Sequence, residues 1–223
     1  MFSAFTLVAC GGDGAGTGGG DKPEAVTTIE TITFESKENL TAIGYRAFYN
    51  ATSLKAIKIP RSCTSIAVEA FPNCISLESL EFAKNSAMEF IGERVFSDCT
   101  ALKQIVNFEE TNIPTLTKQV FHNCSSLVSI TIPNTVTYID SWAVGVLNGK
   151  SSLETVIFEK GSQLKSIYQH CFRNNGKLTS IIIPKSVQTI DKFSFVSTGR
   201  VTGYFGAILY MEGEIERDTF RKG

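Results

Sequence analysis

The chain has 223 residues, of which 43% are hydrophobic and 19% charged, and its formal net charge at pH 7 is −1. This is a globular composition, with enough apolar residues for one sizeable core. A net charge so close to zero argues against nucleic acid as a partner, because nucleic-acid binding normally needs a basic face.

The first ten residues, MFSAFTLVAC, are apolar and end in Leu7-Val8-Ala9-Cys10. They resemble the end of a bacterial lipoprotein signal, in which the cysteine carries the lipid. They are too short for a membrane span and lack a positively charged amino-terminal region. We expect residues 1–10 to be a truncated lipoprotein signal with Cys10 as the lipid attachment site. The alternative is an apolar terminus with no targeting role.

Residues 11–25 begin with GGDGAGTGGG, a run without core-forming side chains. Glycine-rich segments of this kind are flexible linkers. We therefore expect a tether that holds the following domain away from a membrane. The run does not follow a strand, so it does not predict a phosphate-binding loop.

From about residue 26 the chain repeats one pattern with a period in the twenties, and the clearest copy is TLTKQVFHNCSSLVSITIPNTVTYI, from Thr115 to Ile139. Ile130 and Ile132 are two residues apart, so one face of a short strand points inward. Pro133 ends the strand because proline has no N–H to donate. A repeat of this length predicts a solenoid.

The slots of the repeat stay apolar from copy to copy. The aromatic slot holds Phe48, Phe71, Phe96, Phe121, Val144, Phe172 and Phe195, and a second slot holds Ile43, Ile66, Ile91, Leu116, Ile139, Ile167 and Ile190. Strands of the form L-x-x-I-x-I begin at Ile29, Leu54, Leu77, Leu102, Leu127, Leu153 and Leu178. We expect a further strand from Phe205, with Ile208 and Tyr210 facing inward. In the fourth strand, Asn107 stands where an apolar residue is expected.

The string L-x-x-I-x-I-P-x-x-V-x-x-I-x-x-x-A-F-x-x-C resembles the leucine-rich repeat of BspA-like bacterial surface proteins, and the resemblance covers about Val26 to Tyr210. It implies an α/β repeat fold: a right-handed solenoid with a concave parallel sheet of about eight short strands. Second short strands and short helical turns are implied on the convex side. The resemblance also implies a surface or extracellular location, binding to other macromolecules, and no catalytic residues.

The sequence departs from the family pattern at Val144 in the aromatic slot, in the extra residues Gly145 to Lys150, and in an irregular last repeat from Ser197 to Gly203. We expect residues 26–223 to form one leucine-rich-repeat domain with an irregular carboxy-terminal cap from about residue 197.

The cysteines follow the repeat. Cys74, Cys99 and Cys124 occupy one slot in three successive copies, and Cys63 and Cys171 fill other apolar or small slots. A zinc site would need about four convergent ligands, typically in C-x-x-C pairs, and the sequence has no such pairs. Disulfides between neighbouring coils are disfavoured, because parallel Cβ vectors keep the Cβ atoms about a strand spacing apart. We expect buried free thiols.

No catalytic constellation stands out. The two histidines, His122 and His170, flank the repeat phenylalanine, and we expect both to be solvated. Trp142 is expected to be a surface or half-buried packing residue. The strings G-x-S-x-G and H-E-x-x-H and the P-loop are absent from the sequence. We expect neither an enzyme nor a bound metal or cofactor.

The outward strand positions change character along the chain. One column begins with alternating charges, which favour cross-strand pairing: Glu30, Lys55, Glu78 and Lys103. Another column begins with Thr33, Lys58 and Glu81 and continues as Val106, Thr131, Ile157, Ile182 and Leu209. The column between them contains the small polar residues Ser129, Thr155 and Ser180. A contiguous apolar patch on an exposed sheet indicates a contact surface. The alternatives are the strand preference of β-branched residues and a carboxy-terminal tail that covers the patch.

We therefore expect a cell-surface binding or adhesion module that recognises a macromolecular ligand, a protein or a glycan, through this apolar column and its polar neighbours. We expect a monomer on the extracellular face of a bacterial membrane, in contact with the membrane only through its lipid anchor, or else secreted. The alternative is a structural or self-associating surface-layer protein without a foreign ligand.

Overall fold

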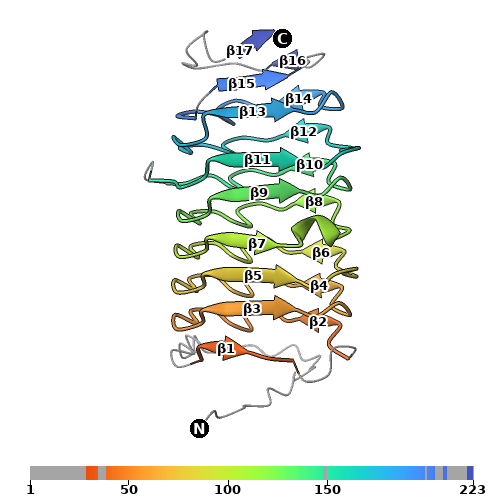
Figure 1. The fold of residues 1–223 in the computed structure, drawn as a ribbon, viewed down its shortest axis with the longest axis vertical. Helices are drawn as coiled ribbons and strands as arrows, with labels where there is room; N and C mark the ends of the chain where they lie inside the picture. The colour runs from red at the N-terminus through yellow and green to blue at the C-terminus, as the bar shows by residue number, and fades with distance from the viewer. Residues whose placement is uncertain are drawn as a thin grey trace, which may run out of the picture.

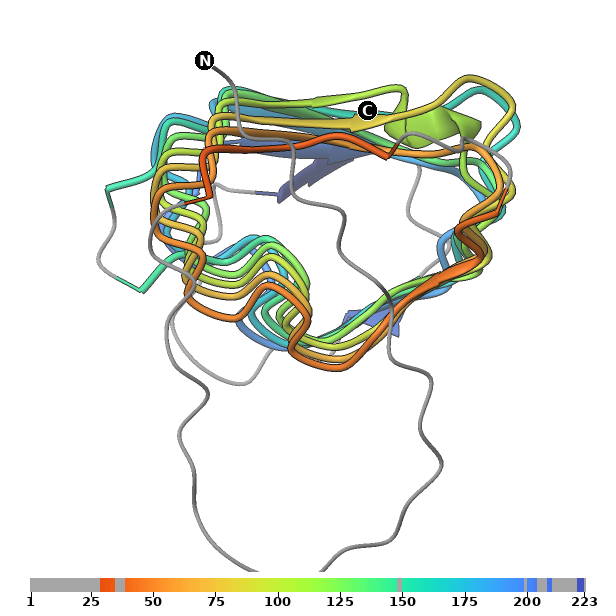
Figure 2. The same cartoon turned by 90° about the horizontal axis from the view of Figure 1, so that it is seen from below.

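The computed structural model describes residues 29–34, 39–147, 150–198, 200–203, 208–209 and 220–222. Over these residues the chain winds into a solenoid of parallel strands, and its turns stack in a nearly straight column (Figure 1). Figure 2 looks along the stack and shows successive turns following one outline, with the longer strands along one side. The predicted signal, Cys10 and the tether lie outside the described residues.

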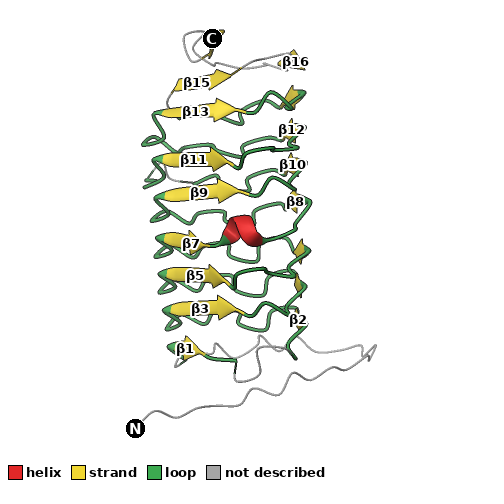
Figure 3. Ribbon diagram, turned by 45° about the vertical axis from the view of Figure 1, so that its right-hand side comes forward, coloured by secondary structure: helices red, strands yellow, loops and turns green. Residues whose placement is uncertain are grey.

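Two faces carry the strands (Figure 3). The long-strand face, which corresponds to the sheet predicted as concave, consists of β1 (Thr31–Ile32), β3 (Ala56–Ile59), β5 (Ser79–Phe82), β7 (Gln104–Val106), β9 (Ser129–Ile132), β11 (Thr155–Phe158), β13 (Ser180–Ile183), β15 (Arg200–Gly203) and β17 (Phe220–Lys222). The short-strand face consists of β2 (Ala42–Ile43), β4 (Ser65–Ile66), β6 (Phe90–Ile91), β8 (Thr115–Leu116), β10 (Tyr138–Ile139), β12 (Ser166–Ile167), β14 (Thr189–Ile190) and β16 (Ile208–Leu209).

The core lies between the two faces and is built from the predicted slots. Along β3 the side chains alternate between exposed and buried, because successive residues of a strand point to opposite sides. The aromatic slot is buried in every turn from Phe48 to Phe195. The ring of Phe71 stacks on those of Phe48 and Phe96, with centroids 4.8 and 5.4 Å apart. Each turn therefore buries its apolar residues against its neighbours, which is the source of stability in a solenoid.

Between a short strand and the next long strand the chain passes through a corner with left-handed residues. Glu69 and Asn73 have φ of 54° and 58°, and the equivalent residues of other turns have similar values. Residues other than glycine rarely adopt this conformation. Here it directs alternate N–H groups toward the next turn: Phe71 N donates to Val95 O at 2.9 Å, and Asn73 N donates to Ser97 O at 2.9 Å. The structure has these corners at the positions where short helical turns were predicted.

The helix present among the described residues is the 3-10 helix η1 (Phe108–Glu110), and it explains the imperfect fourth strand. Asn107 adopts φ 57° and its side-chain amide donates to Phe82 O at 2.9 Å. This turn brings Phe108 into the core, where its ring meets those of Phe82 and Phe121. The expected apolar residue is therefore supplied one position later.

The predicted strand from Phe205 is wrong in position. The long-strand face continues instead through β15, where Thr202 lies opposite Ile182, and through β17. Leu209 lies in β16 on the short-strand face, opposite Ile190. The repeat that contains β15 has no leucine to mark its strand, because Thr198 stands at that position, so the L-x-x-I-x-I pattern does not predict Val201, which lies opposite Ile181.

Candidate binding face on the long strands

The long-strand face is divided into three ladders: β1-β3-β5-β7, β9-β11 and β13-β15-β17. The first interruption follows β7, where η1 replaces the end of the strand. The second lies between β11 and β13. β11 is the strand that follows the Gly145–Lys150 insertion, and it pairs with β9 but not with β13. At the second interruption, therefore, the neighbouring strands β11 and β13 are not joined by a backbone ladder.

A cleft of about 620 Å³ lies at this second interruption. Its walls on the strands include the outward residues Thr155, Ile157, Ser180 and Ile182. Its far end is formed by the connections that follow the strands, namely Glu159, Gly161, Ser162, Pro184, Lys185 and Ser186. The Ser186 hydroxyl donates to Ser162 O at 3.0 Å, which ties the two connections together. The cleft therefore has a defined wall at this end.

The two isoleucines make the cleft apolar at its mouth. Ile182 is 75% exposed and Ile157 is 50% exposed, and they lie on the two strands that flank the second interruption. The core also opens toward the cleft: Phe158 is half-buried, whereas its counterpart Phe82 is fully buried. Thr155 and Ser180 are exposed and small. The arrangement combines exposed apolar area with hydroxyl groups at the same surface, which suits contact with another molecule rather than chemistry on it.

The structure brings together only part of the predicted site. Ser129 lies opposite Thr155 and Thr131 opposite Ile157, so these β9 residues neighbour the strand that lines the cleft but do not line it themselves. Val106 is half-buried, lies opposite Glu81, and is separated from β9 by the first interruption. Leu209 is not part of the predicted column, because its strand belongs to the short-strand face. Cys10 lies outside the described residues.

Sequence reasoning missed the residues at the end of the cleft, among them Pro184 and Lys185. Pro184 fills the proline slot of the repeat, which marks only the end of the strand, and Lys185 follows it at a variable position, so neither residue indicated a surface site. A partial signal was the longer connection after Phe158, where Gly161 adopts φ 83° in the turn. The interruption itself left no trace in the sequence, because the L-x-x-I-x-I pattern is intact on both strands.

The amino-terminal half of the same face has a different character. Lys55 Nζ lies 2.8 Å from Glu30 Oε2, Lys103 Nζ lies 2.7 Å from Glu78 Oε2, and Lys58 pairs with Glu81. The hydrogen bond and charge of Lys103 lower the pKa of Glu78. Exposed pairs of this kind add little stability. They do cancel the charge of these lysines and glutamates, so the described strands of this half present paired charges to a partner.

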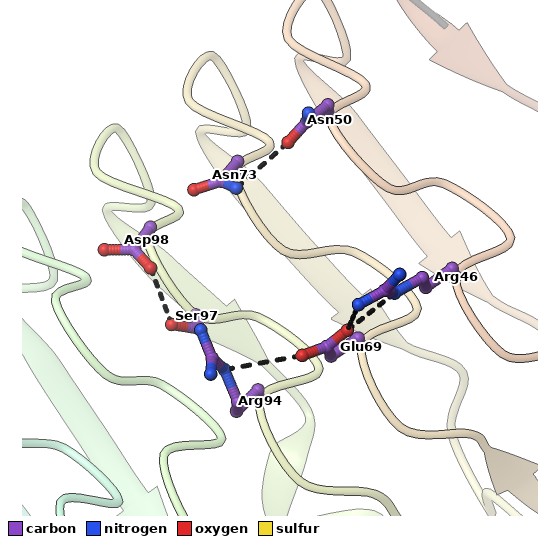
Figure 4. A network of polar contacts seen from close by, with 7 residues as sticks. All are labelled: Arg46, Asn50, Glu69, Asn73, Arg94, Ser97 and Asp98. Carbon is purple, nitrogen blue, oxygen red and sulfur yellow. Dashed lines mark hydrogen bonds and ion pairs between the residues drawn. The ribbon is translucent and has the colours of Figure 1, made fainter. Parts of the chain in front are cut away.

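A second polar network runs along the corners (Figure 4). Glu69 binds Arg46 at 2.6 Å and approaches Arg94 at 3.7 Å, and so joins three successive turns. Asn73 donates to the side chain of Asn50 at 2.9 Å. These contacts link equivalent positions of neighbouring turns, and we assign them to the stability of the stack.

The described cysteines are buried free thiols, in agreement with the predicted burial. In one slot each thiol donates to a carbonyl of the preceding turn; Cys99 Sγ, for example, lies 3.3 Å from Phe71 O. Burial raises the pKa of the Cys99 and Cys171 thiols well above the usual value, which keeps them protonated and unreactive. Within the described ranges, no group of three His, Cys, Asp or Glu side chains could hold a metal ion.

The prediction of a solvated His122 is wrong. Its side chain is only 5% exposed, and its ring meets Trp142 edge-on. Burial lowers the pKa of His122, and burial together with the charge of Arg173 lowers that of His170. Trp142 is half-buried, as predicted. The histidines are therefore packing residues of the corner, and they lie away from the long-strand cleft.

Comparison with known proteins agrees with this architecture. The family model of the BspA type leucine rich repeat region matches six copies, over residues 24–145 and 106–206. A leucine rich cell surface protein from Faecalibacterium prausnitzii A2-165 superposes with a TM-score of 0.56 at 28% identity, covering 73% of this chain and 42% of that one. A leucine-rich repeat protein from Eubacterium ventriosum ATCC 27560 superposes with a TM-score of 0.53 at 17% identity, covering 74% and 47%.

The chain thus spans less than half the length of these two solved structures. A search of curated proteins found no match. No helix among the described residues is long and apolar enough to cross a membrane. The family model covers most of the chain and the fold agrees with it, so the chain belongs to the BspA-type leucine-rich repeat family.

Proposed function

We propose that the chain is a non-enzymatic protein-binding module of a bacterial cell surface, and that its partner contacts the long-strand face around β11 and β13. The observation that carries the proposal is the exposure of Ile157 and Ile182 beside a cleft, on a face whose amino-terminal half carries charge pairs. Large exposed apolar patches on a folded surface mark interaction sites more often than scattered residues do.

The energetics favour contact at this position. Burying an isoleucine side chain is worth about 1.5–3 kcal/mol, and binding energy in protein interfaces concentrates in a few such residues near pockets. Thr155 and Ser180 are small, so they would let a partner approach the sheet closely and hydrogen-bond to their hydroxyl groups. The strands are held by the ladder and core, so little conformational entropy would be lost on binding.

The surface location is supported by the family and by the similar Faecalibacterium prausnitzii protein, which is described as a cell surface protein. The lipid anchor is part of our proposal: Cys10 would carry the lipid, and the glycine-rich residues 11–20 would hold the solenoid off the membrane. A long tether would leave both strand faces accessible to a partner.

The proposal is tested by immobilising the chain through its amino terminus on a biosensor and presenting purified extracellular-matrix proteins. Binding with a dissociation constant of about 1 μM or tighter, by a chain that is monomeric in light scattering, is the expected result. The competing function is self-assembly into a surface layer. Concentration-dependent oligomers without binding to any panel protein would favour self-assembly and contradict the proposal.

A further inference from the structure

The short-strand face carries a group of exposed side chains that the long-strand site does not use. Tyr138 on β10 lies opposite Ser166 on β12, and Ser166 lies opposite Thr189 on β14. The residues two positions further along these turns, in the same order, are Asp140, Tyr168 and Asp191. The backbone N–H groups of Asp140, Tyr168 and Asp191 each donate to a carbonyl of the preceding turn. These three residues therefore form a second row, next to the row of Tyr138, Ser166 and Thr189, on the same face.

Two tyrosine side chains are exposed on this face. Tyr138 is 39% exposed and Tyr168 is 40% exposed. Their ring centroids are 5.9 Å apart and their planes are inclined by 42°. A second cleft, of about 210 Å³, lies beside Tyr168 and is lined also by Thr189, Ile190 and Asp191. This volume is below the roughly 300–1,000 Å³ of pockets for drug-sized ligands, so the cleft suits a single small ring.

Hydrogen bonds hold the polar side chains around the two tyrosines in fixed orientations. Asp191 Oδ1 accepts the N–H of Lys192 at 3.0 Å, and Asp140 Oδ1 accepts the N–H of Ser141 at 2.6 Å. The Thr189 hydroxyl donates to Ser166 Oγ at 2.8 Å, which leaves the Thr189 oxygen able to accept. Each carboxylate is thus held through its Oδ1 atom, while its Oδ2 atom can accept a hydrogen bond from a ligand hydroxyl.

The charges point to a neutral ligand. Lys165 lies directly before Ser166, and Lys192 directly after Asp191, so two cations accompany the two carboxylates. Neither carboxylate forms an ion pair with a lysine or arginine of the described residues. A balanced local charge gives a cationic or an anionic peptide little electrostatic gain. A molecule with an apolar face and many hydroxyl groups matches both the rings and the acceptors.

We propose that the Tyr168 cleft binds a neutral saccharide. One pyranose ring packs its C–H face on the ring of Tyr168 and donates hydroxyl hydrogen bonds to Asp191 and Thr189. Tyr138 contacts the next sugar unit on the neighbouring turn. This site is on a different face from β11 and β13, so the chain holds a protein site and a glycan site that act independently.

The test is saturation-transfer NMR with the full chain and three neutral probes: maltotriose, cellotriose and mannotriose. At least one probe is expected to bind with a dissociation constant of about 1 mM or tighter. Tyr168→Ala should weaken that binding at least about tenfold, and Tyr168→Phe, which keeps the ring, should retain most of it. Tyr45→Ala is the matched control, because Tyr45 is an exposed tyrosine outside the cleft.

Circular dichroism and melting establish that each variant is folded. Absence of transfer from all three probes overturns the proposal, as does unchanged binding by folded Tyr168→Ala. Binding of an arginine-rich peptide in place of the saccharides, lost in Tyr168→Ala, also overturns it and assigns the face to protein. Substitutions at Ile157 and Ile182 should leave saccharide binding unchanged, so a failure here is distinguishable from a failure of the protein site.

Discussion

The ring of His122 meets the ring of Trp142 edge-on, with centroids 5.3 Å apart and planes at 85°. Trp142 in turn stacks on His170 at 4.6 Å, and His170 stacks on Phe193 at 5.3 Å. The row crosses four successive turns of the solenoid. Trp142, His170 and Phe193 all have φ near 60°, which is unfavourable for bulky side chains. The ring contacts offset part of this strain, and they join the turns on both sides of the insertion.

The first prediction is that acid weakens the fold through His122. Its side chain is buried, and its Nδ1 has no hydrogen-bond partner among the described residues. Burial is the largest cause and holds the pKa of His122 below the usual 6.5. Asp98 and a backbone hydrogen bond with Gly145 raise that pKa by less, and Arg94 lowers it. The unfolded chain therefore takes up the proton first. Stability is fully present above about pH 6.5 and is lost as the pH falls toward the folded-state pKa.

Urea unfolding at about pH 7.5 and about pH 5.5 measures this effect. The variant His122→Phe keeps a ring against Trp142 but cannot titrate, so its stability should fall less between the two pH values. His170 titrates in the same direction, and His122→Phe with His170→Phe should reduce the fall further. The same pH dependence in all three proteins would contradict the assignment.

Gly145 is predicted to be irreplaceable in the corner before β11. A Cβ built there would lie 2.6 Å from His170 O and 2.8 Å from the Trp142 ring. Gly145→Ala should therefore destabilise the chain by about 1–3 kcal/mol, because the backbone and the indole cannot both move aside. Gly44→Ala is the control, since a Cβ at Gly44 meets nothing within 4 Å. Equal melting temperatures for the two variants would contradict this prediction, because they would mean that the backbone around Gly145 shifts to accept the methyl group at no cost.

Phe121 is predicted to contribute strongly to the stability of the central turns of the solenoid. Its ring is fully buried, stacks on Phe96 at 5.5 Å and meets Phe108 edge-on at 5.6 Å. Phe121→Ala should lower the free energy of unfolding by about 3–5 kcal/mol, because it leaves a cavity between turns. Thermal melting checks this, and a transition within a degree or two of the wild type would refute the role of the slot.

Cys10 is predicted to anchor the protein when a complete signal precedes it. Fractionation of bacteria that produce the chain behind a complete lipoprotein signal should place it in the membrane. Cys10→Ser should move it to the soluble fraction, because the lipid is the membrane contact that we propose. Cys63→Ser, at a buried core position, serves as a control that keeps Cys10. Membrane retention of the Cys10→Ser chain would exclude this anchor.

The sequence was sufficient for the core, because a repeat imposes the same burial on the same slot in every turn. Phe48, Phe71 and Phe96 are buried where the period places them. The sequence also indicated four residues at the rim of the cleft, since outward positions on a strand follow from the alternation of side chains. Both successes rest on local periodicity, which a single chain displays directly.

What the sequence did not indicate depends on contacts between turns. The break between β11 and β13 arises from how two intact repeats stack, and neither repeat alone records it. His122 was expected at the surface because its own turn places it at a corner, but Trp142 of the next turn covers it. The strand β15 was missed because Thr198 and Gly203 stand in slots that the pattern expects to be apolar.

The most direct test of the account is the binding of the Ile157→Lys, Ile182→Glu variant to the partner found in the matrix-protein panel. These side chains are exposed, so circular dichroism and melting should stay close to the wild type, while affinity falls at least about 100-fold. The control variant Val68→Lys, Ile75→Glu introduces the same two charges at exposed apolar residues of another turn, and it should bind the partner as the wild type does. Wild-type affinity in the folded Ile157→Lys, Ile182→Glu chain would contradict the account and place the site elsewhere.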